Sequence, residues 1–219
     1  LEFRRVLFRS LLKLFRHNPE AIVHEDWAPS MVKLLEENNV HLGVILSIMA
    51  LLIALATKQA SEYEVCLPYV IHIFSRLVLT PRAVREDWLY YLTPSPWLQV
   101  KFLKFLQLYP PPSKSTQADR LNEILKRVLT NTAVSETVNK SNGDHSILFE
   151  AVNLILAYGN AAESSLKTEA MALLGRFISV QEPNIRYLGL EALSRFASIG
   201  LVDDSIKKHQ STVSVSLRD

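Results

Sequence analysis

Cysteine is almost absent from this sequence: Cys66 is the single one among 219 residues. No internal disulfide bond and no cysteine-based zinc cluster can therefore form, and a reducing compartment, cytosol or nucleus, suits the chain best. Glycine is also scarce, with 6 residues. Few glycines argue against a protein built from many tight β-turns.

The sequence also lacks a large excess of charge of either sign. Its formal net charge is +2, which is far from the strongly basic balance typical of nucleic-acid-binding domains. We therefore expect no nucleic-acid partner. Hydrophobic residues make up 48% and charged residues 21% of the chain, a composition typical of a folded globular protein and not of a disordered one.

No apolar run is long and clean enough for a membrane-spanning helix. The longest one covers residues 40–56 and is interrupted by His41, Gly43 and Ser47. A spanning helix needs about 20 predominantly apolar residues. We expect residues 40–57 to form a helix that is buried between neighbouring helices.

Motifs that would indicate catalysis are missing too. The sequence has no Gly-rich phosphate loop, no Gly-x-Ser-x-Gly element and no dinucleotide fingerprint. None of its six histidines has a partner at the His-x-x-x-His spacing that places two imidazoles on one helix turn. Cys66 is expected to be a buried structural thiol, because a nucleophilic thiol requires an activating base nearby. We predict no enzyme activity, no metal or cofactor and no small-molecule substrate.

The sequence does contain a recurring pattern of apolar helices separated by short polar breaks. In its clearest example, Ser95 and Pro96 give a helix start signal and residues 110–112, all proline, end the helix. Between them, apolar residues recur at i, i+4, i+7, i+8 and i+11, along one helix face: Leu98, Phe102, Phe105, Leu106 and Tyr109.

Other boundaries are less regular. Residues 61–64 read as a capping box that opens a helix, in which Pro68 is expected to produce a kink. Thr116 is expected to cap a later helix. Residues 81–95 are an irregular, aromatic-rich connection, and residues 131–143 are expected to form a polar surface loop.

The helices recur at a period that indicates a repeat protein. The second helices of successive pairs begin near residues 38, 96, 144 and 183, and the wider spacings contain the two long connections. Pairs of helices at about 40 residues per unit are typical of HEAT and armadillo repeats, which stack to share a continuous core. We predict an all-α, right-handed α-α superhelix of about four helix pairs over residues 11–219, with a plain globular helical domain as the alternative.

Both ends of the chain look foreign to this pattern. Residues 1–10 contain three arginines, are too short and too charged for a signal peptide, and include a stretch that is similar to a translated sequencing adapter. We expect them to be a non-native leader. A last partial helix is expected to start near Asp203, and the sequence then stops without a helix terminator. We expect the repeats to be a fragment of a longer trunk.

Several segments resemble one known family. Residues 90–101 (YYLTPSPWLQVK) and 106–112 (LQLYPPP), followed by 148–151 (LFEA) and 184–191 (NIRYLGLE), are similar to the adaptins in the family's order. Adaptins are the large subunits of clathrin adaptor complexes. The Pro-Trp-Leu and Tyr-Pro-Pro-Pro pieces resemble the alpha type, which belongs to the plasma-membrane complex, more than the gamma, delta or epsilon types.

The resemblance implies a curved helical trunk that acts as a scaffold in endocytosis and vesicle-mediated protein transport. Its implied partners are the sigma, beta and mu adaptor subunits, with clathrin and phosphoinositide membrane bound through the whole complex. The implied location is cytoplasmic, peripheral on the plasma membrane at clathrin-coated pits. The family's lipid, cargo and appendage sites are expected outside this chain. A scaffold of another helical-repeat family, such as a transport receptor or a phosphatase regulatory subunit, is the alternative.

The aromatic connection and the helix after it supply the candidate partner contacts. Large aromatic side chains on a long connection suit packing against another chain or helix layer, although tryptophans also serve as core or loop anchors. Two lysines on one helix face suit an acidic partner, although a solvated face is the alternative. The candidate contacts are Trp88, Tyr90, Tyr91, Trp97, Lys101 and Lys104.

Overall fold

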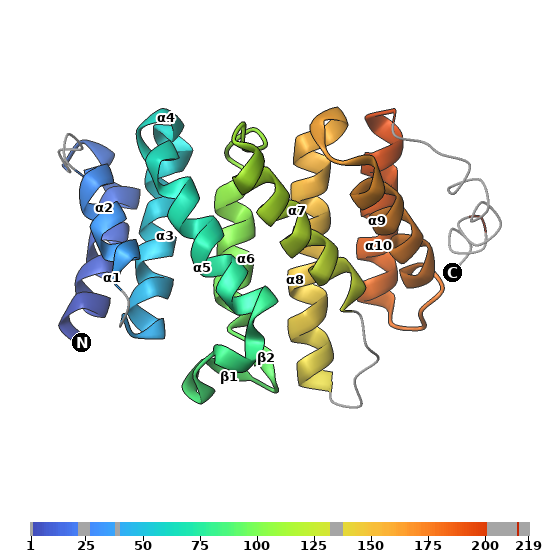
Figure 1. Ribbon diagram of the computed structural model, residues 1–219, viewed down its shortest axis with the longest axis horizontal. Coiled ribbons are helices and arrows are strands. Elements are labelled where there is room, and N and C mark those ends of the chain that lie inside the picture. Colours follow the sequence, from blue (N-terminus) through green and yellow to red (C-terminus); the bar gives the residue numbers. More distant parts are fainter. Residues whose placement is uncertain (1, 22–26, 38–39, 132–137, 201–213, 215–219) are drawn as a thin grey trace.

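The computed structural model describes residues 2–21, 27–37, 40–131, 138–200 and 214 (Figure 1). Their helices stand side by side in chain order, from α1 at one end of an elongated body to α10 at the other. From α1 to α8 the closest packing is between every second long helix along the chain, whereas α9 and α10 pack most on each other, so the helices form two layers.

We name the layers by the position of each helix in its pair. The B layer is α1 (Glu2–His17), α3 (Leu42–Lys58), α6 (Pro96–Leu106), α8 (Val138–Tyr158) and α10 (Pro183–Ser198). The A layer is α2 (Trp27–Glu36), α5 (Leu67–Leu79), α7 (Ser115–Thr130) and α9 (Ser164–Phe177). Within each layer successive helices pack on one another. The all-α solenoid predicted from the repeat period is therefore confirmed.

Short elements connect these helices. They are η1 (Pro19–Ala21), α4 (Ala60–Tyr63), η2 (Glu64–Cys66), η3 (Pro81–Ala83), η4 (Glu86–Trp88), β1 (Leu89–Tyr90), β2 (Thr93–Pro94) and η5 (Gly159–Ala161). The strands β1 and β2 form a two-stranded hairpin inside the predicted aromatic connection. Figure 1 shows this hairpin at one edge of the solenoid, beyond the end of α5.

One continuous apolar core lies between the two layers. At its middle, Phe74 of α5 and Phe102 of α6 are both fully buried, and their ring centroids lie 5.7 Å apart. Helix α3 packs between α1 and α6 and buries residues on most of its circumference, as its nearly uniform apolar sequence predicted. Full burial of one such side chain stabilises the fold by about 1.5–3 kcal/mol.

Several helix starts follow from local chemistry. Pro96 and Pro183 occupy the first turns of α6 and α10, where a missing N–H costs no hydrogen bond. At α3, Nδ1 of His41 accepts a hydrogen bond from the backbone N–H of Gly43 at 3.2 Å, which satisfies one donor that the helix leaves unpaired. The start of α6 at Ser95–Pro96 is thus confirmed.

Two sequence predictions around residue 64 are wrong. Gln59 precedes α4 without a side-chain capping bond, and Ser61 lies within that helical turn, so residues 61–64 form no capping box. Pro68 produces no kink, because the preceding residues form η2 and Pro68 lies in the first turn of the separate helix α5. Similarly, α7 begins at Ser115 with Lys114 before it, so Thr116 is not its cap.

Helix α8 begins at Val138, so residues 138–143 are helical where the sequence predicted a loop. Polar residues build this first turn by bonding to one another: Nζ of Lys140 and Oδ2 of Asp144 pair at 2.5 Å, one turn apart. The hydroxyl of Ser146 donates to the carbonyl oxygen of Asn142 at 2.7 Å. Pairs of opposite charge at i and i+4 stabilise a helix even where its composition resembles that of a loop.

Two further expectations concern the ends. Residues 2–10 form the first part of α1, in which Phe8 is buried and Nη1 of Arg4 pairs with Oε2 of Glu37 at 2.7 Å. That residues 1–10 are a non-native leader stays a prediction. The partial helix expected near Asp203 lies outside the described residues.

Candidate partner-binding site

The hairpin β1–β2 has an unusual turn. Tyr90 pairs with Thr93, which leaves Tyr91 and Leu92 as the two turn residues, and both have positive φ angles of 46° and 69°. A two-residue hairpin turn of this kind is normally made of Asn-Gly or Gly-Gly, because the left-handed conformation costs about 1–2 kcal/mol for other residues. Nevertheless this turn presents Leu92 with 79% of its surface exposed.

Hydrogen bonds from several elements hold the strained hairpin. The hydroxyl of Thr93 donates to Oδ1 of Asp144 at 2.6 Å, and Nδ2 of Asn139 donates to the hydroxyl of Tyr91 at 2.9 Å. The hydroxyl of Ser95 donates to the carbonyl oxygen of Trp88 at 2.9 Å. Two of these bonds reach the first turns of α8, so α8 fixes the position of the hairpin.

We expect Leu92→Gly to be more stable than Leu92→Ala by about 1 kcal/mol, because only glycine adopts a positive φ without strain. The greater conformational freedom of glycine in the unfolded chain reduces this stabilisation. Both substitutions remove the same exposed side chain, so the comparison isolates the backbone. Urea unfolding followed by circular dichroism measures the difference. Equal stability of the two variants would show that the turn is unstrained.

Aromatic rings cover the side of the hairpin that faces α6 and α8. The ring centroid of Tyr90 lies 4.7 Å from that of Tyr91 and 4.6 Å from that of Trp97, both edge to face. Beside them is a groove of about 370 Å³ between α6 and the first turns of α8. Trp97 borders this groove with 55% of its surface exposed.

Two lysines complete the rim of the groove. Lys101 and Lys104 follow Trp97 at one-turn spacing on α6 and line the groove with it. Nζ of Lys104 lies 3.9 Å from Oε2 of Glu150, whose other oxygen accepts a hydrogen bond from Gln107 at 2.6 Å. Burial, and then the charges of Lys104 and Arg16, lower the pKa of Lys101. Positive charge is therefore concentrated at this rim.

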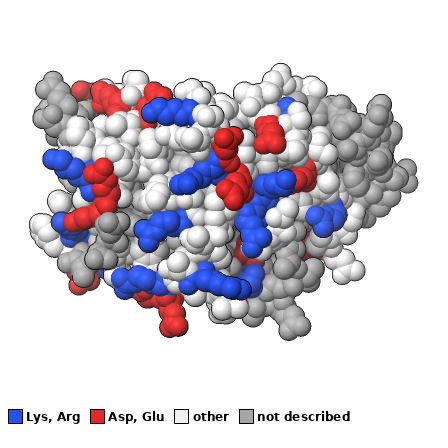
Figure 2. All heavy atoms as spheres, in the orientation of Figure 1, with Lys and Arg blue, Asp and Glu red and all other residues white. Residues whose placement is uncertain are grey.

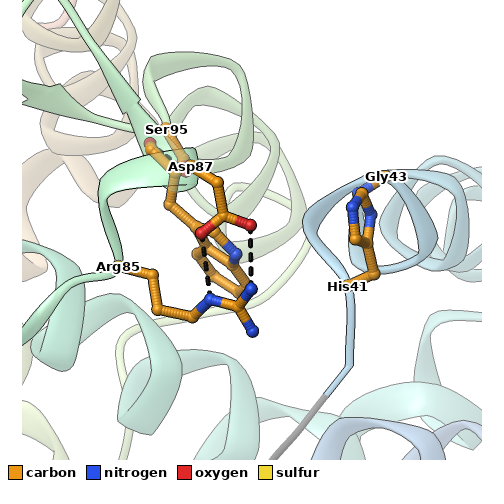
Figure 3. Close-up of polar contacts among 6 residues, drawn as sticks. His41, Gly43, Arg85, Asp87 and Ser95 are labelled. Carbon is orange, nitrogen blue, oxygen red and sulfur yellow. Dashed lines mark hydrogen bonds and ion pairs between the residues drawn. The ribbon is translucent and has the colours of Figure 1, made fainter.

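Four of the six candidate contacts line this groove: Tyr90, Trp97, Lys101 and Lys104. Tyr91 packs against Tyr90 beside it, and Trp88 lies elsewhere. Trp88 lines a separate cavity of about 510 Å³ with residues of α2 and α5. Its indole N–H is buried and has no acceptor among the described residues. Beside it, Nε of Arg85 lies 2.9 Å from Oδ1 of Asp87 and forms an ion pair (Figure 3). The same figure shows His41 at the start of α3, on the opposite side of the picture. Trp88 therefore lies toward α2 and α5, and a partner contact through it stays a prediction.

The α8 side of the groove could not be recognised from the sequence. Asn139, Asn142, Gly143 and Ser146 line it, and the first three belong to a polar segment whose composition predicts a loop. Gly143 is buried, with room for a Cβ at 3.6 Å from the nearest carbon of Pro96. The i, i+4 spacing of Lys140 and Asp144 was the one signal for helix here.

The other basic residues of the described part of the chain are more dispersed, although Arg127 lines a pocket of about 280 Å³ with Lys140. Arg120, Lys126 and Arg127 of α7 are exposed, and Figure 2 shows Lys and Arg spread over this face of the molecule with Asp and Glu among them. Such a mixed surface is typical of solvated helix faces. Lys207 and Lys208 lie outside the described residues.

The Cys66 thiol lies in an environment that does not favour a nucleophile. Burial raises the pKa of the Cys66 thiol to about 11, so the thiol is protonated at neutral pH and is a poor nucleophile. Among the described residues, no three His, Cys, Asp or Glu side chains cluster where they could hold a metal ion. In the same part of the chain no helix has the length and apolar character required to cross a membrane.

Comparison with known proteins agrees with the repeat architecture. The chain is 44% identical over 209 residues to AP-2 complex subunit alpha-1 of Arabidopsis thaliana, covering 95% of this chain and 20% of that protein. It is 40% identical over 213 residues to AP-2 complex subunit alpha-2 of Dictyostelium discoideum, covering 96% and 21%. The chain thus spans about one fifth of the length of these relatives.

Within one organism the alpha type is the more similar one. The AP-1 complex subunit gamma of Dictyostelium discoideum is 28% identical over 211 residues, covering 95% of this chain and 22% of that protein, against 40% for the alpha subunit. This order agrees with the alpha-type motifs at residues 96–98 and 109–112. The family described as Adaptin N terminal region matches residues 8–219. This decides between the adaptins and the other helical-repeat scaffolds: the chain belongs to the adaptin N-terminal region family.

Proposed function

We propose that this chain is a scaffold segment in the trunk of a clathrin adaptor large subunit of the alpha type, and that it holds other adaptor subunits in register. One observation supports the proposal most. The chain folds as stacked helix pairs with a shared core, and it presents exposed aromatic and basic side chains at one edge of the B layer.

The architecture suits a scaffold for a physical reason. Each helix pair of a solenoid packs on its neighbours, so the stack forms an extended body with a long surface on which other chains can be aligned. Trp97 is exposed at the groove, and Tyr91 is exposed beside it against Tyr90. Tryptophan and tyrosine are the residues that most often dominate binding energy at protein interfaces. The work of such a segment is binding, with no bond made or broken.

The proposed partners follow from the relatives, which are named as alpha subunits of AP-2 complexes. They are the sigma, beta and mu adaptor subunits, with clathrin and phosphoinositide membrane engaged through the assembled complex. The proposed place of action is the cytoplasmic side of the plasma membrane, at clathrin-coated pits, in endocytosis.

The test is affinity purification of the full-length protein that contains this chain, followed by mass spectrometry. We expect sigma, beta and mu adaptor subunits in near-equal amounts with the tagged protein, because the subunits of a stable complex co-purify in fixed proportion. An equally expressed, unrelated HEAT-repeat protein with the same tag is the control. Recovery of nuclear-transport or phosphatase components in place of adaptor subunits would contradict the proposal.

A further inference from the structure

We propose that the groove between the β1–β2 hairpin, α6 and α8 binds an acidic segment of another adaptor subunit, with one apolar side chain of that segment docked in the groove against the contacting rings of Tyr90 and Trp97. This inference rests on the proposed function and adds the chemistry of the contact to it.

The shape and lining of the groove favour an inserted side chain. The groove holds about 370 Å³ and is bordered by the ring of Tyr90, by Pro96 and by Trp97, with Val100 beside them. A concave, mostly apolar pocket with aromatic edges is where anchor residues of a partner usually dock. The polar groups of its α8 wall are uncharged, so an apolar anchor meets no buried charge there: Asn139, Asn142 and Ser146.

The charge at the rim selects an acidic partner. The structure records no ion pair of Lys101 with any described residue, and Lys104 reaches Glu150 only at 3.9 Å. Glu150 has 14% of its side chain exposed and is also bonded to Gln107, so it offers little negative charge to an incoming chain. Arg16 of α1 lies near enough to Lys101 to repel it. Carboxylates of a partner would relieve this repulsion, and such complementarity gives specificity.

The strained turn is an independent observation next to the groove: Tyr91 contacts Tyr90 and Asn139, which line the groove, while Leu92 lines a separate pocket. Tyr91 and Leu92 adopt left-handed backbone conformations and expose apolar surface, and the bonds to Asp144 and Asn139 keep them there. Strain held by surrounding structure is concentrated at functional sites. A turn that only closed the hairpin would be more stable with Asn-Gly. Within this tip, Tyr91 is therefore placed to contact the segment that enters the groove.

The first test places a photo-crosslinker in the assembled complex. We substitute p-benzoylphenylalanine for Trp97 in the full-length protein, co-express it with sigma, beta and mu subunits, irradiate, and identify the crosslinked peptide by mass spectrometry. We expect a segment of one of these subunits with at least two Asp or Glu residues next to an aliphatic or aromatic residue. The same crosslinker at Arg120, exposed on α7, is the control and should not label that segment.

Three results would overturn the inference. They are a crosslinked segment without acidic residues, no crosslink in a complex that has assembled, and a crosslink formed with lipid alone when vesicles containing anionic lipid are added. The last would identify the groove as a membrane contact. In each of these cases assembly with sigma, beta and mu is scored separately, so the proposed function can hold while this inference fails.

The second test reverses the charge of the rim. Wild-type and Lys101→Glu/Lys104→Glu large subunits carry different tags and compete for limiting sigma, beta and mu subunits in one cell. We expect incorporation of the variant to fall about tenfold or more relative to wild type, because two attractive contacts become repulsive. The loss should shrink as the salt concentration rises.

The matched control is Arg120→Glu/Lys126→Glu on α7, which reverses two exposed charges that line neither the groove nor the pocket at the hairpin tip and should be incorporated like wild type. Circular dichroism checks that both variants are folded. Equal incorporation of the Lys101/Lys104 variant and wild type would overturn the inference.

Discussion

Phe102→Ala is expected to lower the free energy of unfolding by about 3–5 kcal/mol, the cost typical of removing a buried aromatic ring and leaving a cavity. Phe102 is fully buried on α6 and lies against Phe74 of α5, so the substitution weakens the contact between the two layers at the middle of the stack. Urea unfolding monitored by far-UV circular dichroism measures the loss.

Tyr187→Ala is the control, because it also replaces an aromatic side chain by alanine but at an exposed position. Tyr187 lies on α10 with 66% of its surface exposed, and its removal should change stability by less than about 0.5 kcal/mol. In a solenoid each pair depends on its neighbours, so Phe102→Ala should also broaden the transition by uncoupling the helices before α6 from those after it. A loss below about 1 kcal/mol would mean that α5 and α6 do not share a tightly packed core.

Asp144→Ala should cost about 2–3 kcal/mol and release the hairpin from α8. Oδ1 of Asp144 accepts a hydrogen bond from the hydroxyl of Thr93, and Oδ2 forms an ion pair with Lys140. Thr93 is buried. Alanine removes both acceptors and leaves the buried hydroxyl unpaired. Unfolding experiments measure the cost, and hydrogen exchange of residues 89–94 measures the release of the hairpin.

Asp144→Asn separates the two contributions. The amide oxygen of asparagine can still accept the hydroxyl of Thr93, while the ion pair with Lys140 is lost. Because that pair is partly solvated, its loss alone should cost at most about 1 kcal/mol. If Asp144→Asn is as damaging as Asp144→Ala, the ion pair and not the bond to Thr93 holds the hairpin.

Much of the helical stack could be predicted because apolar periodicity reports burial directly. The expected helix at residues 40–57 matches α3 (Leu42–Lys58), and Ser95–Pro96 marks the start of α6. The errors arose where local signals compete. Residues 61–64 fit a capping box in sequence, but the chain makes two short turns there, and Pro68 begins a new helix. Composition alone gives no means of choosing between a kinked helix and two helices joined by a turn.

The candidate site was predicted in part. The aromatic residues and lysines could be proposed because a cluster of aromatic residues and two lysines at helical spacing are visible in the sequence. Those that lie together in the structure are Tyr90, Tyr91, Trp97, Lys101 and Lys104. The α8 wall was missed because it comes from residues far along the chain that resemble a loop. The separation of Trp88 was also missed, since neighbouring residues of an irregular segment can face opposite sides. Tertiary contacts such as that of Thr93 with Asp144 leave no local pattern.

The position of the hairpin has a consequence for how adaptor trunks can diversify. Helices α5 and α6 pack on each other directly, while the connection between them projects at the edge of the stack (Figure 1). Its length and sequence are therefore independent of the repeat geometry, as insertions in solenoids generally map to loops on one face. Exchanging residues 81–94 between trunks is therefore expected to change the shape of this edge while leaving the pitch of the superhelix unaltered.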